Sequence, residues 1–281
     1  MNFNLEYFIA FRYLQSKRDE RFVSISSFFS FIGITIGVAT LIIVMSVMNG
    51  FRIELLDKII GINGHAVAYL NLNKNNDINE LVENIQDLPN IDYVSQELEF
   101  NAMISLRKNS SGILVKGIEK ADLLERNSIS NNIIEGRLED FNDKSVVIGS
   151  RLASFMGVKL NDKKTLLTLN TNVTPFGSIP IADEYKVVGI FEVGMYDYDR
   201  GIIFLPRKYA ANLSRSDREV SQLEIFFLDS KNLDASILSI KKLLDDKGRV
   251  FSWKSLHKEL FNALEIEKKV MFLILFLIVF V

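Results

Sequence analysis

The chain has 281 residues, 48% hydrophobic and 24% charged, with a formal net charge of −2. This composition excludes a disordered chain, and the lack of a basic excess excludes a nucleic-acid-binding protein. The absence of cysteine excludes disulfides, thiolate metal sites and cysteine nucleophiles, and it leaves the compartment open.

Residues 1–22 predict a helix that lies on the cytoplasmic surface of a membrane. Its apolar side chains fall on one helical face, as such a helix requires: Phe3, Tyr7, Ala10, Phe11 and Leu14. Basic residues come just before the apolar run that follows: Arg12, Lys17, Arg18 and Arg21. By the positive-inside rule the N-terminus is cytoplasmic, and the part of the chain after the apolar run is on the other side.

Residues 23–48 contain no ionisable side chain and predict transmembrane helix 1. At about 1.5 Å per residue they reach roughly 39 Å, more than the ~30 Å hydrocarbon core of a bilayer. The alternative is a cleaved signal peptide. Its apolar region is typically ~7–15 residues long and closer to the N-terminus, so the sequence favours a membrane span.

Small residues form one stripe along this helix, at spacings of three and four: Ser26, Ser30, Gly33, Gly37 and Thr40. The stripe includes a GxxxG motif, and it favours close packing against another helix in the membrane. The alternative interpretation is that glycine and serine are simply common in membrane helices.

Residues 49–269 predict a large α+β domain with its own core. Two strand–helix–strand patterns near its ends predict one subdomain built from residues 49–117 and 205–269, with a β-rich subdomain, residues 118–204, inserted between them. The expected elements are a helix to residue 60, ending at 61–64, strands at 66–72, 93–107, 145–148, 164–169, 185–191, 222–228 and 249–252, and helices at 78–88, 150–156 and 233–244.

The loop at residues 171–182 is expected to connect two strands as a hairpin. Pro175 and Pro180, half of the prolines in the chain, flank its tip. Because proline fixes φ and lacks an N–H donor, we expect a stiff tip outside the sheet that presents Phe176 and Ile179. Such a tip is either a preorganised apolar site for a protein partner or a long turn folded back on its own domain.

The last stretch, residues 253–281, predicts one helix that passes from polar to apolar. Residues 270–281 are its only wholly apolar part. Since about twenty apolar residues are needed to span a bilayer as a helix, we expect here the start of a truncated transmembrane helix 2.

Signals for chemistry are weak. His65 and His257 are the two candidate imidazole bases, and both are expected to be solvated residues at the ends of helices or strands. A calcium site at Glu192, Asp197 and Asp199 fits no EF-hand spacing, so an acidic hairpin turn is favoured there. There is no GxxxxGK[ST] motif, so ATP would be hydrolysed by another subunit, and we expect neither a metal nor a cofactor.

The segments YFIAFRYLQSKR and FVSISSFFSFIGITIGVATLIIVMSVMNGFRIELLDKIIGINGH resemble the N-terminus of the LolC/LolE lipoprotein-releasing permeases of Gram-negative inner membranes. The closing ALEIEKKVMFLILFLIVFV resembles the entry to their second membrane helix. These proteins are similar to the MacB-type transporters. The resemblance therefore implies an α+β membrane protein with a periplasmic domain of two subdomains between its first two membrane helices.

The resemblance also implies a set of partners. These are a LolD-type ATPase, a second permease (LolE-like or a second copy), a LolA-type periplasmic carrier, acylated lipoprotein and membrane lipid. It implies that the proline-flanked loop is the hook that holds the carrier in LolC-type subunits: Thr174, Pro175, Phe176, Gly177, Ser178, Ile179 and Pro180. The residues after Pro180 lack the basic or amide side chains expected near a carrier.

The mechanism that we expect is mechanical transmission from the ATPase, through the membrane helices, to the exported domain. Val44, Val47 and Met48 are candidates for a lipoprotein lining, together with the small-residue stripe. Two other classes remain open: an FtsX-like signalling or scaffold protein of the same architecture, and a membrane-anchored hydrolase that uses His65 or His257.

Overall fold

The computed structural model describes residues 5, 8–9, 21–71, 78–106, 109–174, 177–229 and 233–280. It forms two compact units, a helical unit of residues 1–55 and 257–281 and a mixed unit of residues 56–256. Most of the surface helix expected over residues 1–22 lies outside the described residues. Those described before Arg21 are Leu5, Phe8 and Ile9, which are helical and exposed.

Helix α2 (Arg21–Asn63) contains 43 residues and continues well past the predicted span at 23–48. Within its stretch from Ile25 to Asn63, the most apolar window of 18 residues has a mean hydropathy of 2.5, so the helix is long and apolar enough to cross a membrane. No proline interrupts it. The helix ends where the sequence predicted, since Gly64 follows with φ +72°, the left-handed conformation that commonly terminates helices.

The helical pattern predicted from residue 253 onward is broken in the structure. Helix α10 (Trp253–Leu256) ends before His257, and α11 (Lys258–Phe280) begins after it. The break follows from burial: the Trp253 side chain is buried in the mixed unit, and its backbone N–H donates to the carbonyl of His65 at 2.9 Å. The helical unit begins at His257.

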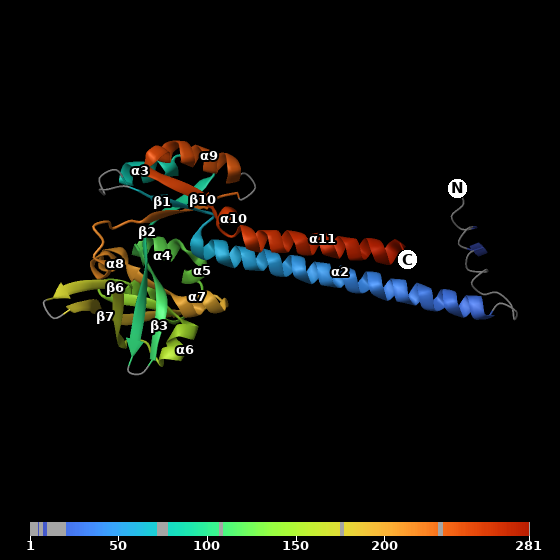
Figure 1. The fold of residues 1–281 in the computed structure, drawn as a ribbon, viewed down its shortest axis with the longest axis horizontal. Helices are drawn as coiled ribbons and strands as arrows, with labels where there is room; N and C mark the ends of the chain where they lie inside the picture. Colours follow the sequence, from blue (N-terminus) through green and yellow to red (C-terminus); the bar gives the residue numbers. More distant parts are fainter. Residues whose placement is uncertain are drawn as a thin grey trace. The chain divides into compact units, whose positions relative to one another are not determined.

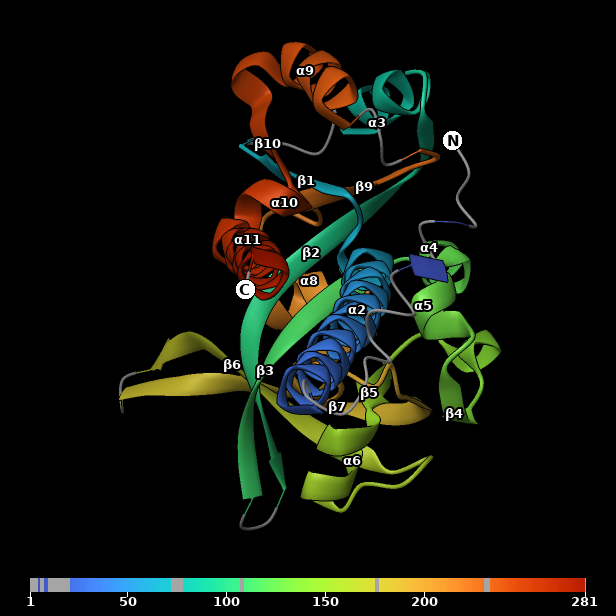
Figure 2. The same ribbon diagram turned by 90° about the vertical axis from the view of Figure 1, so that its right-hand side faces the viewer.

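One part of the mixed unit is an antiparallel sheet whose strand order is β10-β1-β9-β2. Helices α3 and α9 lie on the same face of this sheet and bury a continuous apolar core against it (Figures 1 and 2). The elements are β1 (Ala66–Leu70), α3 (Ile78–Gln86), β2 (Ile91–Leu106), β9 (Gln222–Phe227), α9 (Leu233–Leu244), η4 (Asp245–Lys247) and β10 (Gly248–Ser252).

The other part is a ring of paired strands. From β2 the pairings run to β3, β8, β5, β7 and β6, and β6 pairs with β2 again. The additional strands are β3 (Asn109–Ile118), β4 (Ile133–Gly136), β5 (Ser145–Gly149), β6 (Lys163–Thr174), β7 (Gly177–Phe191) and β8 (Ile202–Pro206), with β4 pairing outside the ring along β7.

Short helices pack on the ring and complete two apolar cores. Of these helices and their neighbouring strands, β5, α6, β6 and β7 were predicted, whereas β3, β4 and the helices between them were not. The helices are α4 (Lys120–Glu125), α5 (Asn127–Ser130), η2 (Leu138–Asp140), α6 (Ser150–Met156), α7 (Tyr196–Gly201) and α8 (Arg207–Ser214).

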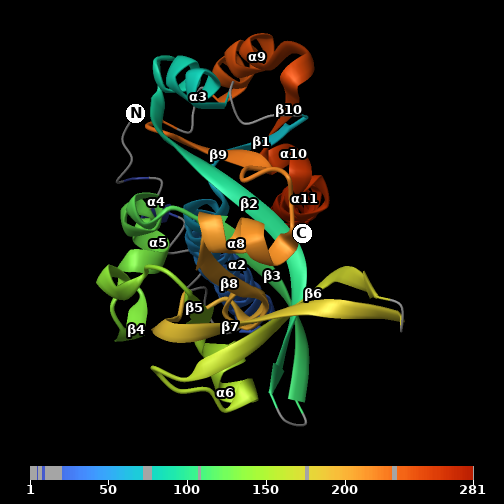
Figure 3. The same cartoon turned by 90° about the vertical axis from the view of Figure 1, so that its left-hand side faces the viewer.

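The β6–β7 hairpin corrects one expectation. The loop at 171–182 was expected to stay outside the sheet, but Thr171 pairs with Pro180 and Thr174 with Gly177, so Ile179 also lies in the ladder. This part extends away from the ring as a two-stranded ribbon (Figure 3). In such a ribbon proline is tolerated where its missing N–H would face outward, as on any edge strand.

Strand β2 belongs to both sheets. Its residues up to Glu97 pair with β9, and its residues from Leu98 onward pair with β3. The chain therefore enters the ring within β2 and returns to the first sheet at β9. The two subdomains with boundaries after residues 117 and 204 remain a prediction.

Candidate functional site

The helical unit leaves most of its large apolar side chains uncovered, as the predicted membrane span requires, although Leu41 is buried. Val44 and Val47, two of the residues expected to line a lipoprotein site, are exposed. Met48, the third, lies in a cavity of about 170 Å³ between α2 and α11. That cavity is lined by Met45, Met48, Asn49, Arg52, Leu264, Glu267, Lys268 and Met271.

The small-residue stripe of α2 is only partly covered. A Cβ added to Gly37 would meet Ile278 of α11 at 3.6 Å, so this glycine lies against the second helix. Gly33 meets no described side chain within 4 Å, and Ser26, Ser30 and Thr40 are exposed. Within the described residues, the stripe is therefore open except at one position.

The predicted hook is partly described. Thr174 ends β6, and Gly177, Ser178, Ile179 and Pro180 begin β7, so the backbone of these residues forms the outer end of the ribbon. The tip residues Pro175 and Phe176 lie outside the described residues.

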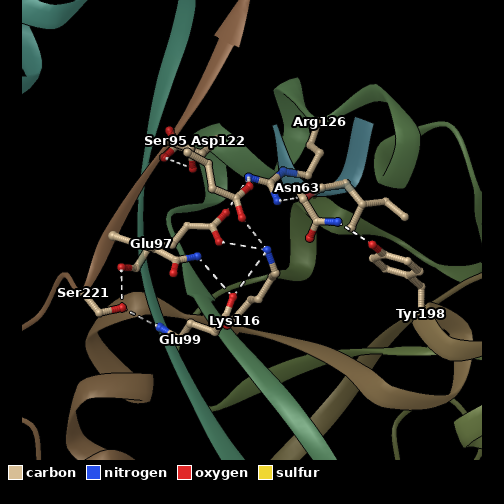
Figure 4. A network of polar contacts seen from close by, with 12 residues as sticks. Asn63, Ser95, Glu97, Glu99, Lys116, Asp122, Arg126, Tyr198 and Ser221 are labelled. Carbon is tan, nitrogen blue, oxygen red and sulfur yellow. Dashed lines mark hydrogen bonds and ion pairs between the residues drawn. The ribbon is translucent and has the colours of Figure 1, made fainter. Parts of the chain in front are cut away.

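The last turn of α2 is held by three side chains of the mixed unit. Arg126 donates from Nη1 to the carbonyl of Ile62 at 2.6 Å, and the hydroxyl of Ser128 donates to the carbonyl of Gly61. Asn63 donates from its amide to the Tyr198 hydroxyl at 2.5 Å (Figure 4). Because the last four carbonyls of a helix have no partner in the helix, the bonds from Arg126 and Ser128 satisfy two carbonyls that would otherwise be unpaired. We call Arg126, Ser128 and Tyr198 the helix clasp.

Arg126 also belongs to a buried ion cluster, which we define as Glu97, Lys116, Arg126 and Glu224. Arg126 Nη2 lies 2.5 Å from Glu97 Oε1 and 3.0 Å from Glu224 Oε2. Lys116 Nζ lies 2.5 Å from Glu224 Oε1 and 3.3 Å from Glu97 Oε2. All four side chains are at most 1% exposed. The cluster therefore balances two positive charges against two negative ones.

The cluster lies where the two sheets meet. Glu97 is the last residue of β2 that pairs with β9, Glu224 is on β9, and Lys116 is on β3 of the ring. Arg126 lies between α4 and α5. Figure 4 shows Glu97, Lys116 and Arg126 pointing toward one another from three of these elements. One group of charges thus joins both sheets, the α4–α5 segment and the end of α2.

Burial and the neighbouring charges together set the pKa values of the cluster. Burial and the neighbouring Glu97 carboxylate raise the pKa of Glu224 to about 7. Burial also acts to raise the pKa of Glu97, but the charges of Arg126 and Lys116 lower it overall. Burial acts to lower the pKa of Lys116, and the Glu224 and Glu97 carboxylates raise it overall, so Lys116 stays protonated.

The carboxylates of Glu97, Glu99 and Glu224 are close enough to one another to hold a metal ion. However, Lys116 contacts all three carboxylates, and Arg126 contacts two of them. These ammonium and guanidinium groups already supply the positive charge that a metal would bring. The arrangement is that of an ion-pair cluster.

The candidate catalytic and calcium-binding residues predicted from the sequence do not form a common site among the described residues. His65 is half-buried, not solvated as expected, and its Nδ1 accepts the backbone N–H of Phe227 at 3.1 Å. His257 is exposed at the start of the helical unit. Asp199 is buried and accepts the N–H groups of Val193 and Gly194, so its segment is the short helix α7, not a hairpin turn.

The sequence reasoning missed both the clasp and the cluster. A signal was present for the cluster, because Lys116 and Glu224 are single charges within the apolar strands ILVKGI and QLEIFF. A charge in a strand that is otherwise buried on both faces requires a buried partner. No comparable signal marked Ser128 or Tyr198.

The chain is similar to known proteins over most of its length. The family model described as the MacB-like periplasmic core domain matches residues 27–242. The lipoprotein-releasing system transmembrane protein LolC of Neisseria meningitidis is 30% identical over 281 residues, covering 99% of this chain and 68% of that protein. LolE of Haemophilus influenzae is 29% identical over 245 residues, covering 84% of this chain and 59% of that protein.

Among solved structures, the periplasmic region of MacB from Actinobacillus actinomycetemcomitans is similar, with a TM-score of 0.47 and 13% identity. The match covers 74% of this chain and 97% of that one. The chain spans about two thirds of the length of the curated LolC relatives that it matches.

Proposed function

Because this chain belongs to the family of LolC-type lipoprotein-releasing transmembrane proteins, with a MacB-like periplasmic core domain, we propose that it is the permease subunit of an ABC-type lipoprotein-releasing complex. In this role it extracts acylated lipoproteins from the inner membrane and passes them to a soluble periplasmic carrier. The observation that carries the proposal is the match to LolC over 99% of the chain.

We further propose that the chain lies in the inner membrane of a Gram-negative bacterium, with a cytoplasmic N-terminus and a periplasmic mixed unit. Two features support this orientation. Basic residues precede the apolar run, and a domain of more than about 60 residues is translocated largely regardless of its charge. The matched family is described as a MacB-like periplasmic core domain, which supports a periplasmic mixed unit.

The proposed subunit is not itself an enzyme. ATP would be hydrolysed by a LolD-type subunit in the cytoplasm, and a second permease would face the small-residue stripe of α2. Because Gly33, Ser26 and Ser30 are uncovered in the described chain, this stripe has room for a closely packed helix. Val44, Val47 and Met48 would then contact the acyl chains of the lipoprotein.

The ribbon of β6 and β7 is the proposed contact for a LolA-type carrier. The paired backbones of residues 171–174 and 177–180 extend beyond the ring, and pairing reduces their freedom before binding (Figure 3). Because the ribbon is already ordered, it loses less conformational entropy when a partner binds than a flexible loop would. Phe176, which the sequence predicts at the tip of this hairpin, would supply the apolar side chain.

Photocrosslinking tests this contact. We expect a photoreactive amino acid in place of Phe176 to form an adduct with the soluble carrier, and the same group in place of Tyr196 to form none. Tyr196 is the matched control because it is an exposed aromatic residue of α7, outside the ribbon. A normally expressed protein that gives no adduct from position 176 would refute the hook assignment.

Depletion of the protein tests the wider function. The proposed permease predicts that outer-membrane lipoproteins accumulate in the inner membrane. An FtsX-like scaffold with the same architecture predicts unchanged lipoprotein sorting. A hydrolase would lose its activity when His65 and His257 are both replaced by alanine.

A further inference from the structure

We propose that the helix clasp and the ion cluster form the joint that couples movement of α2 to both sheets of the mixed unit, with Arg126, Ser128 and Tyr198 as positioning residues. This inference rests on the proposed function, and it names the residues through which this chain would pass a movement of its membrane helix to its periplasmic domain. Three observations support it.

The first observation is that α2 reaches the mixed unit without a break. The helix runs from Arg21 to Asn63 as a single element and contains no proline. Proline is one of the main causes of sharp kinks in helices, and α2 has none. In this proposal, the single helix carries a movement of its membrane part to its last turn.

The second observation is that the last turn is held from more than one side. Arg126 and Ser128, in the α4–α5 segment, donate hydrogen bonds to two successive carbonyls of α2. Tyr198, in α7, accepts a hydrogen bond from the Asn63 side chain. The helix also approaches α5 so closely that a Cβ on Gly61 would lie 2.8 Å from the Cβ of Ser128. The turn therefore cannot slide or rotate without displacing these elements.

The third observation is that one guanidinium belongs to both the clasp and the cluster. Arg126 uses Nη1 for Ile62 at the end of α2 and Nη2 for Glu97 and Glu224 in two strands (Figure 4). The guanidinium is planar and rigid, so its two ends move together. Because ion pairs in a buried site are costly to separate, a shift of the Ile62 carbonyl moves β2 and β9 with it.

The test separates coupling from folding by removing two clasp hydroxyls that lie outside the ion cluster. The test variant carries Ser128→Ala and Tyr198→Phe. The control variant carries Ser239→Ala and Tyr209→Phe. In the control, Ser239 bonds a carbonyl within α9 and Tyr209 bonds Asp143 at the surface, so the same atoms are deleted away from α2.

The assembled complex is reconstituted in lipid vesicles with ATP, lipoprotein and carrier, and lipoprotein release is measured per ATP hydrolysed. We expect the test variant to release at least about fivefold less lipoprotein per ATP hydrolysed than the unchanged protein. A coupling free energy carried by one or two hydrogen bonds has that size. We expect the control variant to remain within about twofold of the unchanged protein. A purely structural role would lower the amount of complex but not this ratio.

A second readout follows the helix directly. The chain contains no cysteine, so spin labels can be placed at Val47→Cys and Tyr196→Cys, two exposed positions. We expect the change in the distance between the labels on adding nucleotide to differ between the test variant and the unchanged protein. The single Tyr198→Phe variant is measured in parallel, and it should change both readouts in the same direction by a smaller amount.

The outcomes are distinguishable. If the unchanged complex hydrolyses ATP but releases no lipoprotein, the proposed function fails. If the unchanged complex releases lipoprotein and the test variant releases as much per ATP, the joint is overturned and the proposed function stands. The joint is also overturned if the control variant loses release to the same extent.

Discussion

The two units of this protein differ in which side chains they expose and which they bury. In the helical unit, large apolar residues such as Phe28, Phe31 and Ile36 are more than half exposed. In the mixed unit, even the charges of Glu97 and Arg126 are fully removed from the surface. The same chain thus exposes apolar side chains in the helical unit and buries charged side chains in the mixed unit.

This contrast shows that the two units are built for different solvents. An exposed apolar helix is stable in lipid, where its side chains need no protein cover. The buried charges of the mixed unit are tolerated because they are paired with one another, not because lipid or water reaches them. Three predictions test the contrast, beginning with the largest expected effect.

The first prediction concerns the buried charges. Arg126→Met removes one cation and leaves Glu97 and Glu224 facing only Lys116, which should cost about 3–5 kcal/mol of unfolding free energy. The thermal midpoint of the mixed unit should fall by about 10 °C, since a unit of this size loses ~2–4 °C per kcal/mol. Differential scanning calorimetry of the detergent-solubilised protein measures it.

The control for this prediction is Lys144→Met. Lys144 pairs with Asp183 at 2.6 Å, but its side chain is 54% exposed. Exposed ion pairs contribute about 0–1 kcal/mol, so the midpoint should hardly move. Equal shifts for the two variants would show that burial of the cluster is unimportant.

The second prediction concerns the exposed apolar residues. Ile36→Lys places a charge near the middle of the predicted span, which should cost about 3 kcal/mol of insertion free energy. Ile134→Lys makes the same change on β4 of the mixed unit, where Ile134 is 53% exposed, and it should cost no more than about 0.5 kcal/mol. Carbonate extraction of membranes should release only the first variant. If carbonate releases the unchanged protein as well, α2 is not held by lipid.

The third prediction concerns pH. The pKa of Glu224 is raised to about 7, above its ordinary 4.5, so between these values the folded protein binds more protons than the unfolded one. Glu224 therefore makes the fold more stable as pH falls from 8 to 6, by about 1 kcal/mol, and this contribution is lost as pH rises through 7. In Glu224→Gln the rise in midpoint between pH 8 and pH 6 should disappear.

The longer helices of the first half of the chain were among the most predictable parts of the fold. An unbroken apolar run followed by a helical pattern up to residue 60 predicted α2, and Gly61 to Gly64 predicted its end. These signals are local, because helix bonds join residues four apart. Strands β1, β5, β9 and β10 were also predicted from short apolar runs, within one or two residues.

The ring and the cluster were not predictable in this way. Ring closure depends on β6 pairing with β2, two strands whose paired residues are about 60 positions apart. The cluster needs Glu97, Lys116, Arg126 and Glu224 to meet from four separate segments. A single sequence indicates that Lys116 and Glu224 need partners, but it does not identify them. The proline-flanked hairpin was placed correctly, but the extent of its pairing was underestimated.

The long strand β2 has a practical consequence for anyone who dissects this protein. Its first part completes one sheet and its second part completes the ring, within a single uninterrupted run of sixteen residues. Cutting the chain between Glu97 and Leu98 would leave an unpaired edge strand in both halves, and such edges promote aggregation. Expression of either half alone should therefore fail, and residues 56–256 should be produced as one piece.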